Sequence, residues 1–456
     1  MKTDHAQTIS GQLANYANKL TYDDLPDDVR KLAHLVLLDT LGCAMAGAGT
    51  EEVAQIRRAM GQAKGGGGDA SYWGTHDKAP LPLAALANGA AVHAREIDDF
   101  GGCAHSGAVV IPAALGVAAR TGASGKDLLT AIVVGYDIAR RVMDGGGGYQ
   151  AFKKLGWHST SACGGFGAAA AAAKLLGLDA QHIQWALGYA GSNAGGTWAY
   201  IPDGAMSKRI HPGFAAHTGV VAAYLAANDV TGPTQIFEAP WGGYYPTYVG
   251  ATATPDKAVD GLGRDFRIRL VGFKPYAACR GIHSSVDVMI ALRRQHKVSA
   301  ADVKQVIVRG SPTHMKQLSK QDVETMLDAQ FSLPYSIATT LVSGGAMLDQ
   351  YTADALKRPE VRDLARRVRL KLEPLVEDGD EPYLDVELHD GRTLTDRVLI
   401  ARGDCENPLP EDELRGKFRT AASATLNTQQ IERLEHAILH AETLADSREL
   451  VALMTP

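Results

Sequence analysis

The sequence predicts a mainly α-helical protein, in which both ends of the chain form one all-helical domain and an α+β domain is inserted between them. Three observations predict this fold class. Apolar residues recur every three or four positions in the first 262 residues, as in helices that bury one face. The same spacing returns in the last part of the chain, after residue 402. Between them, residues 263–401 contain segments in which apolar residues alternate, as in half-buried strands.

The first part of the helical domain, residues 1–262, contains three clear helices. Residues 29–45 and 125–142 carry apolar side chains at helical spacing, and Asp or Ser stands near the start of each, where it can cap the first turn. Residues 162–176 form a helix rich in Ala and Gly, whose small side chains favour close packing against neighbouring helices. The second part of this domain, residues 402–456, contains one clear helix, at residues 431–444.

The inserted domain, residues 263–401, combines strands with helices. An amphipathic segment precedes the first strand, and H-D-G at residues 389–391 has the composition of a tight turn between the last two strands. The expected helix is residues 282–294, and the expected strands are residues 303–309, 368–372, 383–388 and 393–400.

Composition limits the classes of protein that this chain can belong to. Apolar residues make up 45% of the 456 residues and charged residues 21%, which is typical of a globular protein and excludes a largely disordered one. The net charge of -5 gives no reason to expect nucleic acid or an anionic membrane as a partner.

The N-terminus lacks the apolar segment of a secretory signal, so we expect a cytoplasmic protein. Five widely spaced cysteines without a C-x-x-C motif predict neither a disulfide framework nor a metal site, and no cofactor motif is present.

A cluster of basic residues is the most informative feature of the chain. Lys208, Arg209 and His211 stand within four positions, between Ala- and Gly-rich segments that are suited to burial. Burying such charges costs several kcal/mol unless an anion pairs with them. The simplest partner is the carboxylate of a small substrate, and the alternative is a basic loop on the surface.

Two histidines are candidates for proton transfer. Asp98 and Asp99 precede His105 by a few residues, so a carboxylate could orient this imidazole and raise its basicity. His158 stands just before the helix at 162–176, where an imidazole of low pKa is favoured. The structural alternative for Asp98, Asp99 and His105 is that they are ordinary surface residues. The structural alternative for His158 is that it stands at a helix start capped by Ser159 or Thr160.

A second group of basic residues lies in the inserted domain. Lys274, Arg280 and His283 occur within ten positions, and Cys279 lies among them. Cys279 could act as a nucleophile if a neighbouring cation lowered its pKa, but a small buried residue is the commoner role of cysteine. Tyr335 follows a proline and could donate a proton, although a tyrosine in such a segment more often belongs to the core.

Together these segments resemble the MmgE/PrpD family, which includes 2-methylcitrate dehydratases, cis-aconitate decarboxylases and iminodisuccinate epimerases. The resemblance covers almost the whole chain and rests on seven motifs in order. They are A-N-G-A-A-V-H-A-R-E-I-D-D-F, H-S-G-A-V-V-I-P-A-A-L, G-W-H-S-T-S-A-C-G-G-F-G, S-K-R-I-H-P-G, T-G-P-T-Q-I-F-E, K-P-Y-A-A-C-R and F-S-L-P-Y. The resemblance implies a helical domain from both chain ends, an α+β lid and a homodimer.

The resemblance also implies which residues surround the active site. Catalytic roles would fall to His105, His158, Lys208, Lys274 and Tyr335, and substrate would contact Asp98, Arg209, Cys279, Arg280 and His283. This sequence departs from the family pattern in three places. The usual D-F-D-D-T is E-I-D-D-F at residues 96–100, a usual His-Pro is His105-Ser106, and Cys279 stands where the decarboxylase branch carries a His, which argues against itaconate-forming chemistry.

These residues predict a cofactor-free lyase that acts on a small di- or tricarboxylate, and 2-methylcitrate is the expected type of substrate for dehydration. Lys208, Arg209 and Lys274 would bind carboxylates and stabilise negative charge on the reacting carbon. His105 or His158 would be the base, and Tyr335 or the other histidine the acid. The alternatives are an epimerase of an iminodisuccinate-like dicarboxylate, a cis-aconitate-type decarboxylase, and a carboxylate-binding protein without turnover.

Overall fold

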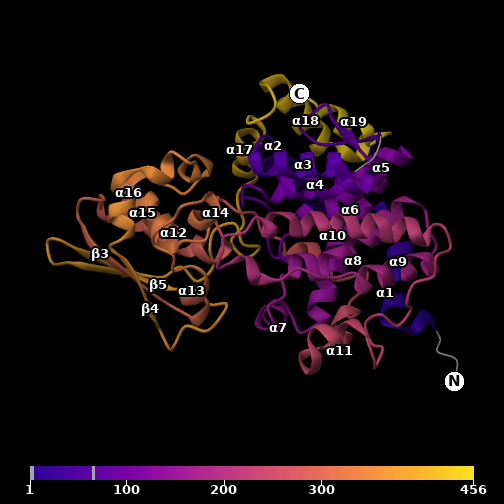
Figure 1. Ribbon diagram of the computed structural model, residues 1–456, viewed down its shortest axis with the longest axis horizontal. Coiled ribbons are helices and arrows are strands. Elements are labelled where there is room, and N and C mark those ends of the chain that lie inside the picture. Colours follow the sequence, from indigo (N-terminus) through magenta and orange to yellow (C-terminus); the bar gives the residue numbers. More distant parts are fainter. Residues whose placement is uncertain (1–4, 64–66) are drawn as a thin grey trace. The chain divides into compact units, whose positions relative to one another are not determined.

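The computed structural model describes residues 5–63 and 67–456 and confirms the predicted fold class of helices with a smaller α+β part (Figure 1). The chain divides into two compact units. The helical unit consists of Met1–Tyr200, Ala205–Val271 and Glu411–Pro456, and the α+β unit of Ile201–Gly204 and Gly272–Pro410.

The helical unit takes its helices from both ends of the chain (Figure 1). Before residue 272 they are α1 (Ile9–Lys19), α2 (Asp27–Ala48), α3 (Glu51–Ala63), α4 (Leu81–His93), α5 (Gly107–Thr121), α6 (Gly125–Gly145), α7 (Tyr149–Lys154), α8 (Ser159–Leu175), α9 (Ala180–Ser192), α10 (Ser207–Ala226) and α11 (Tyr244–Tyr248). After residue 410 they are α17 (Glu411–Ala422), α18 (Thr428–Leu439) and α19 (Arg448–Leu453). A short hairpin of β1 (Ala70–Ser71) and β2 (Lys78–Ala79) precedes α4.

Helix α8 lies at the centre of the helical unit, beside α5, α6 and α10 (Figure 1). Its small side chains bring the neighbouring backbones close. A Cβ atom on Gly167 would lie 2.2 Å from the carbonyl oxygen of Gly135 in α6, and one on Gly219 of α10 would lie 2.4 Å from the Cβ of Ala168. These glycines therefore permit the close packing that the composition predicted.

Helix α2 forms another part of this core. Among the described residues, it is the one helix long and apolar enough to cross a membrane by length and composition. However, 78% of its apolar window is buried inside the protein, as in the core helix of a globular domain. The helix contains the predicted segment 29–45, and α6 contains the predicted segment 125–142.

The α+β unit contains a four-stranded sheet in the order β4-β3-β5-β6. β3 pairs with β4 in parallel and with β5 in antiparallel orientation, and β5 and β6 form an antiparallel hairpin. The strands are β3 (Val303–Gly310), β4 (Val368–Leu372), β5 (Tyr383–Leu388) and β6 (Thr393–Asp396). The helices are α12 (His283–His296), α13 (Pro312–Gln317), α14 (Met326–Gln330), α15 (Leu333–Ser343) and α16 (Pro359–Ala365).

The last strand is shorter than predicted. The sequence predicted a strand over residues 393–400, but β6 ends at Asp396. Leu399 is 69% exposed and Ile400 is 39% exposed, so the apolar residues that suggested a longer strand have no face to pack against. The turn between β5 and β6 is confirmed, and Gly391 adopts a φ of 91° there, a conformation that glycine favours.

Candidate active site

The candidate active site of the helical unit is built around the loop that joins α4 to α5. His93 is the last residue of α4, and His105 lies two residues before α5 begins at Gly107. Two non-glycine residues of this loop adopt positive φ angles, Glu96 at 57° and Ala104 at 110°. Such conformations cost free energy and persist where surrounding contacts fix them, which is common at functional sites.

Asp98 lies between two imidazoles. Its Oδ2 atom is 2.8 Å from Nδ1 of His93 and 3.2 Å from Nδ1 of His105, and its side chain is fully buried. Burial alone would raise the pKa of Asp98, but the two imidazoles hold it well below its usual value. Asp98 is therefore an ionised carboxylate that orients both rings, as the sequence predicted for one of them.

His93 is an uncharged imidazole with a defined tautomer. The ammonium group of Lys208 donates to Nε2 of His93 at 2.7 Å, so the ring proton stands on Nδ1 and is donated to Asp98. Burial, together with the nearby charge of Lys208, lowers the pKa of His93 to about 3 against the opposing effect of Asp98. His93 was not among the sequence-predicted site residues.

His105 presents a lone pair toward the less buried side of the site. Its Nδ1–H donates to the carbonyl oxygen of Asp99 at 2.9 Å, and its side chain is 12% exposed. No described residue hydrogen-bonds to its Nε2. In the uncharged ring, Nε2 is therefore a proton acceptor that a ligand can reach.

Asp99 has a different role from its neighbour. Its two carboxyl oxygens accept from the backbone N–H of Gly107, at 3.1 and 3.2 Å. Burial and the negative charges of Asp98 and Asp39 raise the pKa of Asp99 well above its usual value. Asp99 therefore supports the start of α5 and orients His105 through its backbone carbonyl.

His158 occupies the N-cap position of α8 and is buried. Its Nδ1 lies 3.0 Å from Nδ1 of His211, and its Nε2 lies 3.1 Å from the hydroxyl of Thr160. Burial and the charge of Lys208 lower its pKa well below the usual value, and the pKa of His211 is lowered to about 4 by the same causes. The alternative that Ser159 or Thr160 caps α8 is wrong, because His158 itself occupies the N-cap position, the Ser159 hydroxyl has no hydrogen-bond partner among the described residues and the Thr160 hydroxyl faces the imidazole.

Three imidazoles thus form a compact triangle, which we call the histidine cluster: His93, His105 and His158. The ring centroids are 4.4 Å apart for His93 and His105, 6.4 Å for His93 and His158, and 6.3 Å for His105 and His158. Trp198 packs edge-on against His158 at 5.1 Å. A small molecule that contacts one of these rings is within reach of the others.

The basic residues beside the cluster are paired within the protein. Lys208 donates to Oε2 of Glu96 at 2.6 Å, and Arg209 donates to the same oxygen at 2.7 Å and to the carbonyl of His93 at 2.9 Å. All three side chains are at most 4% exposed. The sequence took a substrate carboxylate as the simplest partner of these charges, whereas in the structure the buried carboxylate of Glu96 pairs with both of them.

The structure therefore brings together five of the predicted site residues, namely Asp98, His105, His158, Lys208 and Arg209. Their catalytic and binding roles stay predictions. Two further residues, His93 and Glu96, were missed, and His211 was singled out only as a member of the basic cluster. Each lies in a motif that carried the family resemblance, so the signal was present, but spacing along the chain does not say which polar residues of a motif face each other.

The other five predicted site residues belong to the α+β unit. Lys274 is fully buried, and His283 is buried with its Nε2 3.1 Å from the carbonyl oxygen of Ala278. Arg280 donates to Glu381 at 2.6 Å and to Asp404 at 3.1 Å, so two carboxylates of its own unit balance its charge.

Tyr335 and Cys279 have the contacts of structural residues. The hydroxyl of Tyr335 donates to the carbonyl oxygen of Gln350 at 2.6 Å, and burial raises its pKa to about 12. Both features are what a core tyrosine requires. The backbone N–H of Cys279 donates to the carbonyl of Gln330, and its Sγ lies 4.0 Å from Nε2 of Gln317. The roles predicted for these residues stay predictions.

One group of side chains has the composition of a metal site, which the sequence did not predict. His93, Asp98 and His105 offer ligand atoms that all lie within 4.8 Å of one another. However, both Nδ1 atoms already face Asp98, and the ammonium of Lys208 contacts the remaining nitrogen of His93. A metal cation would have to displace these contacts and lie beside an ammonium group, so the arrangement favours proton transfer over metal binding.

Comparison with known proteins identifies the family. The MmgE/PrpD N-terminal domain matches residues 11–255, and the MmgE/PrpD C-terminal domain matches residues 276–442. The chain therefore belongs to the MmgE/PrpD family, as the motifs predicted.

Among the relatives are proteins named for one reaction. The cis-aconitate decarboxylase-like protein oryM of Aspergillus oryzae is 29% identical over 475 residues, covering 98% of this chain and 97% of the relative. The cis-aconitate decarboxylase of Aspergillus terreus is 28% identical over 475 residues, covering 98% and 96%. The human cis-aconitate decarboxylase is 28% identical over 467 residues, covering 98% and 95%.

Proposed function

We propose that this protein is a lyase that acts on a small tricarboxylate by proton transfer at the histidine cluster, and that it decarboxylates cis-aconitate or a close analogue. The observation that carries the proposal is the triangle of three imidazoles, with ring centroids 4.4–6.4 Å apart, beside the buried ammonium of Lys208. Full-length similarity to cis-aconitate decarboxylases supports the choice of reaction.

The charge balance of such a reaction suits uncharged imidazoles. When a carboxylate leaves as CO₂, the C–C bond breaks, its electron pair moves into the adjacent alkene, and a carbon atom takes up one proton. The protein must therefore supply one proton per turnover. A bound trianion raises the pKa of neighbouring imidazoles, so rings that are uncharged in the free protein take up a proton when substrate binds.

His105 is the proposed proton donor to carbon. Its Nδ1–H is fixed by the carbonyl of Asp99, so a proton from solvent enters at Nε2, the atom that a ligand can reach. The side chain is 12% exposed, which gives that proton a path. Asp98 stabilises the imidazolium that forms, because its ionised carboxylate lies 3.2 Å away.

Lys208 is the proposed stabiliser of negative charge in the transition state. Its ammonium is buried, where charge interactions are stronger than in water, and Glu96 and His93 hold it in place. His158 lies within the influence of this charge and contacts the hydroxyl of Thr160, so these two groups can orient a substrate carboxylate or hydroxyl through hydrogen bonds. Each of these groups is fixed before substrate arrives, so little reorganisation is needed during the reaction.

Dehydration of a 2-methylcitrate-like acid is the second candidate function. Cys279 stands where the decarboxylase branch of the family carries a His, and this departure favours the dehydratase reaction that the sequence led us to expect. Dehydration needs a base for the proton on carbon and an acid for the leaving hydroxyl. Two imidazoles 6.3 Å apart, His105 and His158, supply such a pair, and no net proton is consumed.

The deciding experiment offers cis-aconitate, 2-methylcitrate, citrate and iminodisuccinate to the purified protein in deuterated water and follows each by NMR. Decarboxylation of cis-aconitate would give itaconate that carries one deuterium on carbon. Dehydration would give an alkene from 2-methylcitrate, and an epimerase would give α-deuteration with inverted configuration. The proposal is wrong if all four acids remain unchanged, or if the variant His105→Asn turns over substrate as fast as the unchanged protein.

A further inference from the structure

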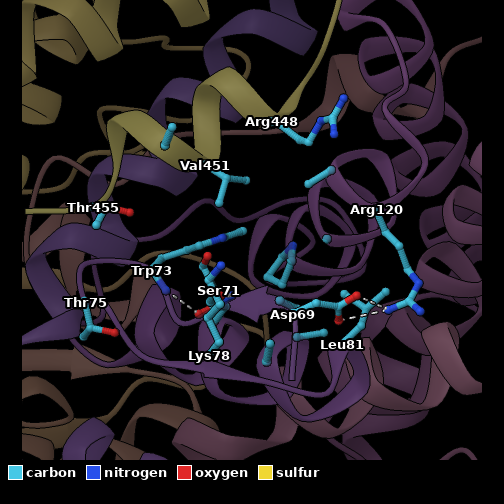
Figure 2. Close-up of a pocket in the computed structure, with 18 of the residues that line it drawn as sticks. Asp69, Ser71, Trp73, Thr75, Lys78, Leu81, Arg120, Arg448, Val451 and Thr455 are labelled. Atoms are coloured by element: carbon cyan, nitrogen blue, oxygen red, sulfur yellow. Dashed lines mark hydrogen bonds and ion pairs between the residues drawn. The ribbon is translucent and has the colours of Figure 1, made fainter. Parts of the chain in front are cut away.

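A cavity lies in the helical unit, lined by residues other than those of the histidine cluster. It has a volume of about 540 Å³ and is lined by residues of the β1–β2 hairpin, α4, α5 and α19 (Figure 2). A cavity of this size accommodates a small organic molecule. It shares α4 with the histidine cluster but uses another face of that helix. Asn88, which lines the cavity, and His93 are five residues apart, about 140° around the axis at 3.6 residues per turn.

The wall of this cavity is apolar and fixed by hydrogen bonds. Trp73 is 3% exposed and lies with Leu81 and Val451 around the same space (Figure 2). The backbone N–H of Trp73 donates to Oδ1 of Asn88 at 3.0 Å, and Nδ2 of Asn88 donates to the carbonyl of Ser71 at 3.1 Å. These bonds attach the hairpin to α4, so the indole is held in position. No described residue hydrogen-bonds to the indole Nε1 of Trp73.

The rim of the cavity is basic, although the protein as a whole carries a net charge of -5. Lys78, Arg120 and Arg448 line it, and Asp69 is the one acidic residue among the lining side chains. Arg120 pairs with Asp69 at 2.7 Å, and these side chains are 49% and 65% exposed (Figure 2). Arg448 pairs with Asp446, and these side chains are 68% and 35% exposed. Exposed ion pairs contribute little free energy, so the carboxylate of a ligand can replace these partners at small cost.

We propose that this cavity binds a small organic anion that carries an aromatic ring, and that this site is separate from the catalytic one. The ring would pack against Trp73 and Leu81, where apolar surface is already fixed. The anionic group would lie at the rim and pair with Lys78 and Arg120. The proposal does not depend on the proposed function, because the two sites have no lining residue in common.

The test uses 8-anilinonaphthalene-1-sulfonate, an aromatic anion whose fluorescence rises in apolar surroundings. We expect saturable binding of one probe per chain, and binding about tenfold weaker in the variant Lys78→Gln/Arg120→Gln, which removes two exposed charge interactions. Ala452→Trp, which places an indole at an exposed position of the rim, should abolish binding. Arg58→Gln is the matched control, since Arg58 also forms an exposed ion pair, with Glu51, but does not line the cavity.

Two further measurements separate this site from the catalytic one. Circular dichroism must show that each variant keeps the helical content of the unchanged protein. Saturating citrate, an analogue of the proposed substrate, should leave probe binding unchanged. The proposal is overturned if Ala452→Trp binds the probe as the unchanged protein does, if Arg58→Gln weakens binding as much as the double variant, or if citrate displaces the probe.

Discussion

Replacing Glu96 by Gln should destabilise the helical unit far more than a similar change at another buried glutamate. In the structure, one oxygen of Glu96 accepts from both Lys208 and Arg209, at 2.6 and 2.7 Å. The two basic side chains are 1% and 4% exposed, so water cannot replace the lost carboxylate. Gln keeps the shape and an acceptor oxygen but removes the carboxylate charge that both buried cations contact.

The expected loss follows from the behaviour of buried ion pairs. Removal of one partner from a buried pair costs about 3–5 kcal/mol, because the remaining charge stays without compensation. The amide oxygen still accepts hydrogen bonds, so we expect the lower part of this range, about 3 kcal/mol. Removing Lys208 as well, in Glu96→Gln/Lys208→Met, should recover part of the loss, since one of the two buried cations that contact Glu96 is then absent.

Glu435 provides the matched control within the same unit. Its side chain is 4% exposed and also accepts from two arginines, Arg415 and Arg419, each at 2.6 Å. These arginines, however, are 37% and 54% exposed and can hydrate when the carboxylate is removed. Glu435→Gln should therefore cost only about 1 kcal/mol.

The assay is urea unfolding of the unchanged protein and the three variants, followed by circular dichroism and by tryptophan fluorescence. Transitions that coincide by both probes allow free energies of unfolding to be compared. The reasoning predicts that Glu96→Gln loses about 2 kcal/mol more than Glu435→Gln. Equal losses in the two single variants would refute it, because the exposure of the partner cations would then have no effect.

Four further predictions concern the histidine cluster. His105→Asn should lower kcat about 10²-fold or more, without loss of stability, because it removes a partly exposed proton donor; unchanged kcat would contradict the role. Asp98→Asn should lower both kcat and the free energy of unfolding, since two imidazoles lose their orienting charge, and an effect on only one of these would be unexpected. The pKa of His93 is about 3 in the folded protein and about 6.5 in the unfolded chain. The uncharged ring therefore makes its full contribution to the free energy of unfolding above pH 6.5. That free energy falls by about 1.4 kcal/mol per pH unit as the pH decreases from 6.5 toward 3. Urea unfolding at pH 7 and 5.5 should thus show a smaller pH dependence in His93→Gln than in the unchanged protein, and equal slopes would refute this. Turnover should persist in excess EDTA. A loss of turnover that added zinc reverses would instead show that His93, Asp98 and His105 bind a metal ion.

Helices and strands could be predicted where the apolar residues repeat at regular spacing and all lie on one buried face of the element. Helices α2 and α6 contain the predicted segments, and α12 begins one residue after the predicted start at 282, because their apolar spacing continues over three turns or more. The predicted helix at residues 431–444 extends too far toward the C-terminus. Helix α18 ends at Leu439, and the carbonyl of Leu444 accepts from the backbone N–H of Gly125 at the start of α6. That tertiary hydrogen bond has no signal in the local sequence.

The candidate site could be predicted only in part, and for a similar reason. The pairing of Asp98 with His105 spans seven residues of one loop, so the sequence alone suggested it. The contact of Lys208 with His93 joins residues 115 positions apart on two helices, and no local pattern indicates it. Glu96 was visible as a departure from the family motif, but its role as the counter-charge of two cations depends on how α10 packs beside the loop.

The adjacent residues Asp98 and Asp99 show how this packing decides the chemistry. The two side chains are chemically identical and fully buried, yet the pKa of Asp98 is lowered and that of Asp99 is raised. Asp98 faces two imidazoles, whereas Asp99 faces one backbone N–H and lies near two other carboxylates. A single buried negative charge is thus concentrated between His93 and His105. His93 already donates its one ring proton to Asp98 and accepts from Lys208, so under the proposed function it is His105, through its Nε2, that would take up a proton when an anionic substrate binds and return it to carbon.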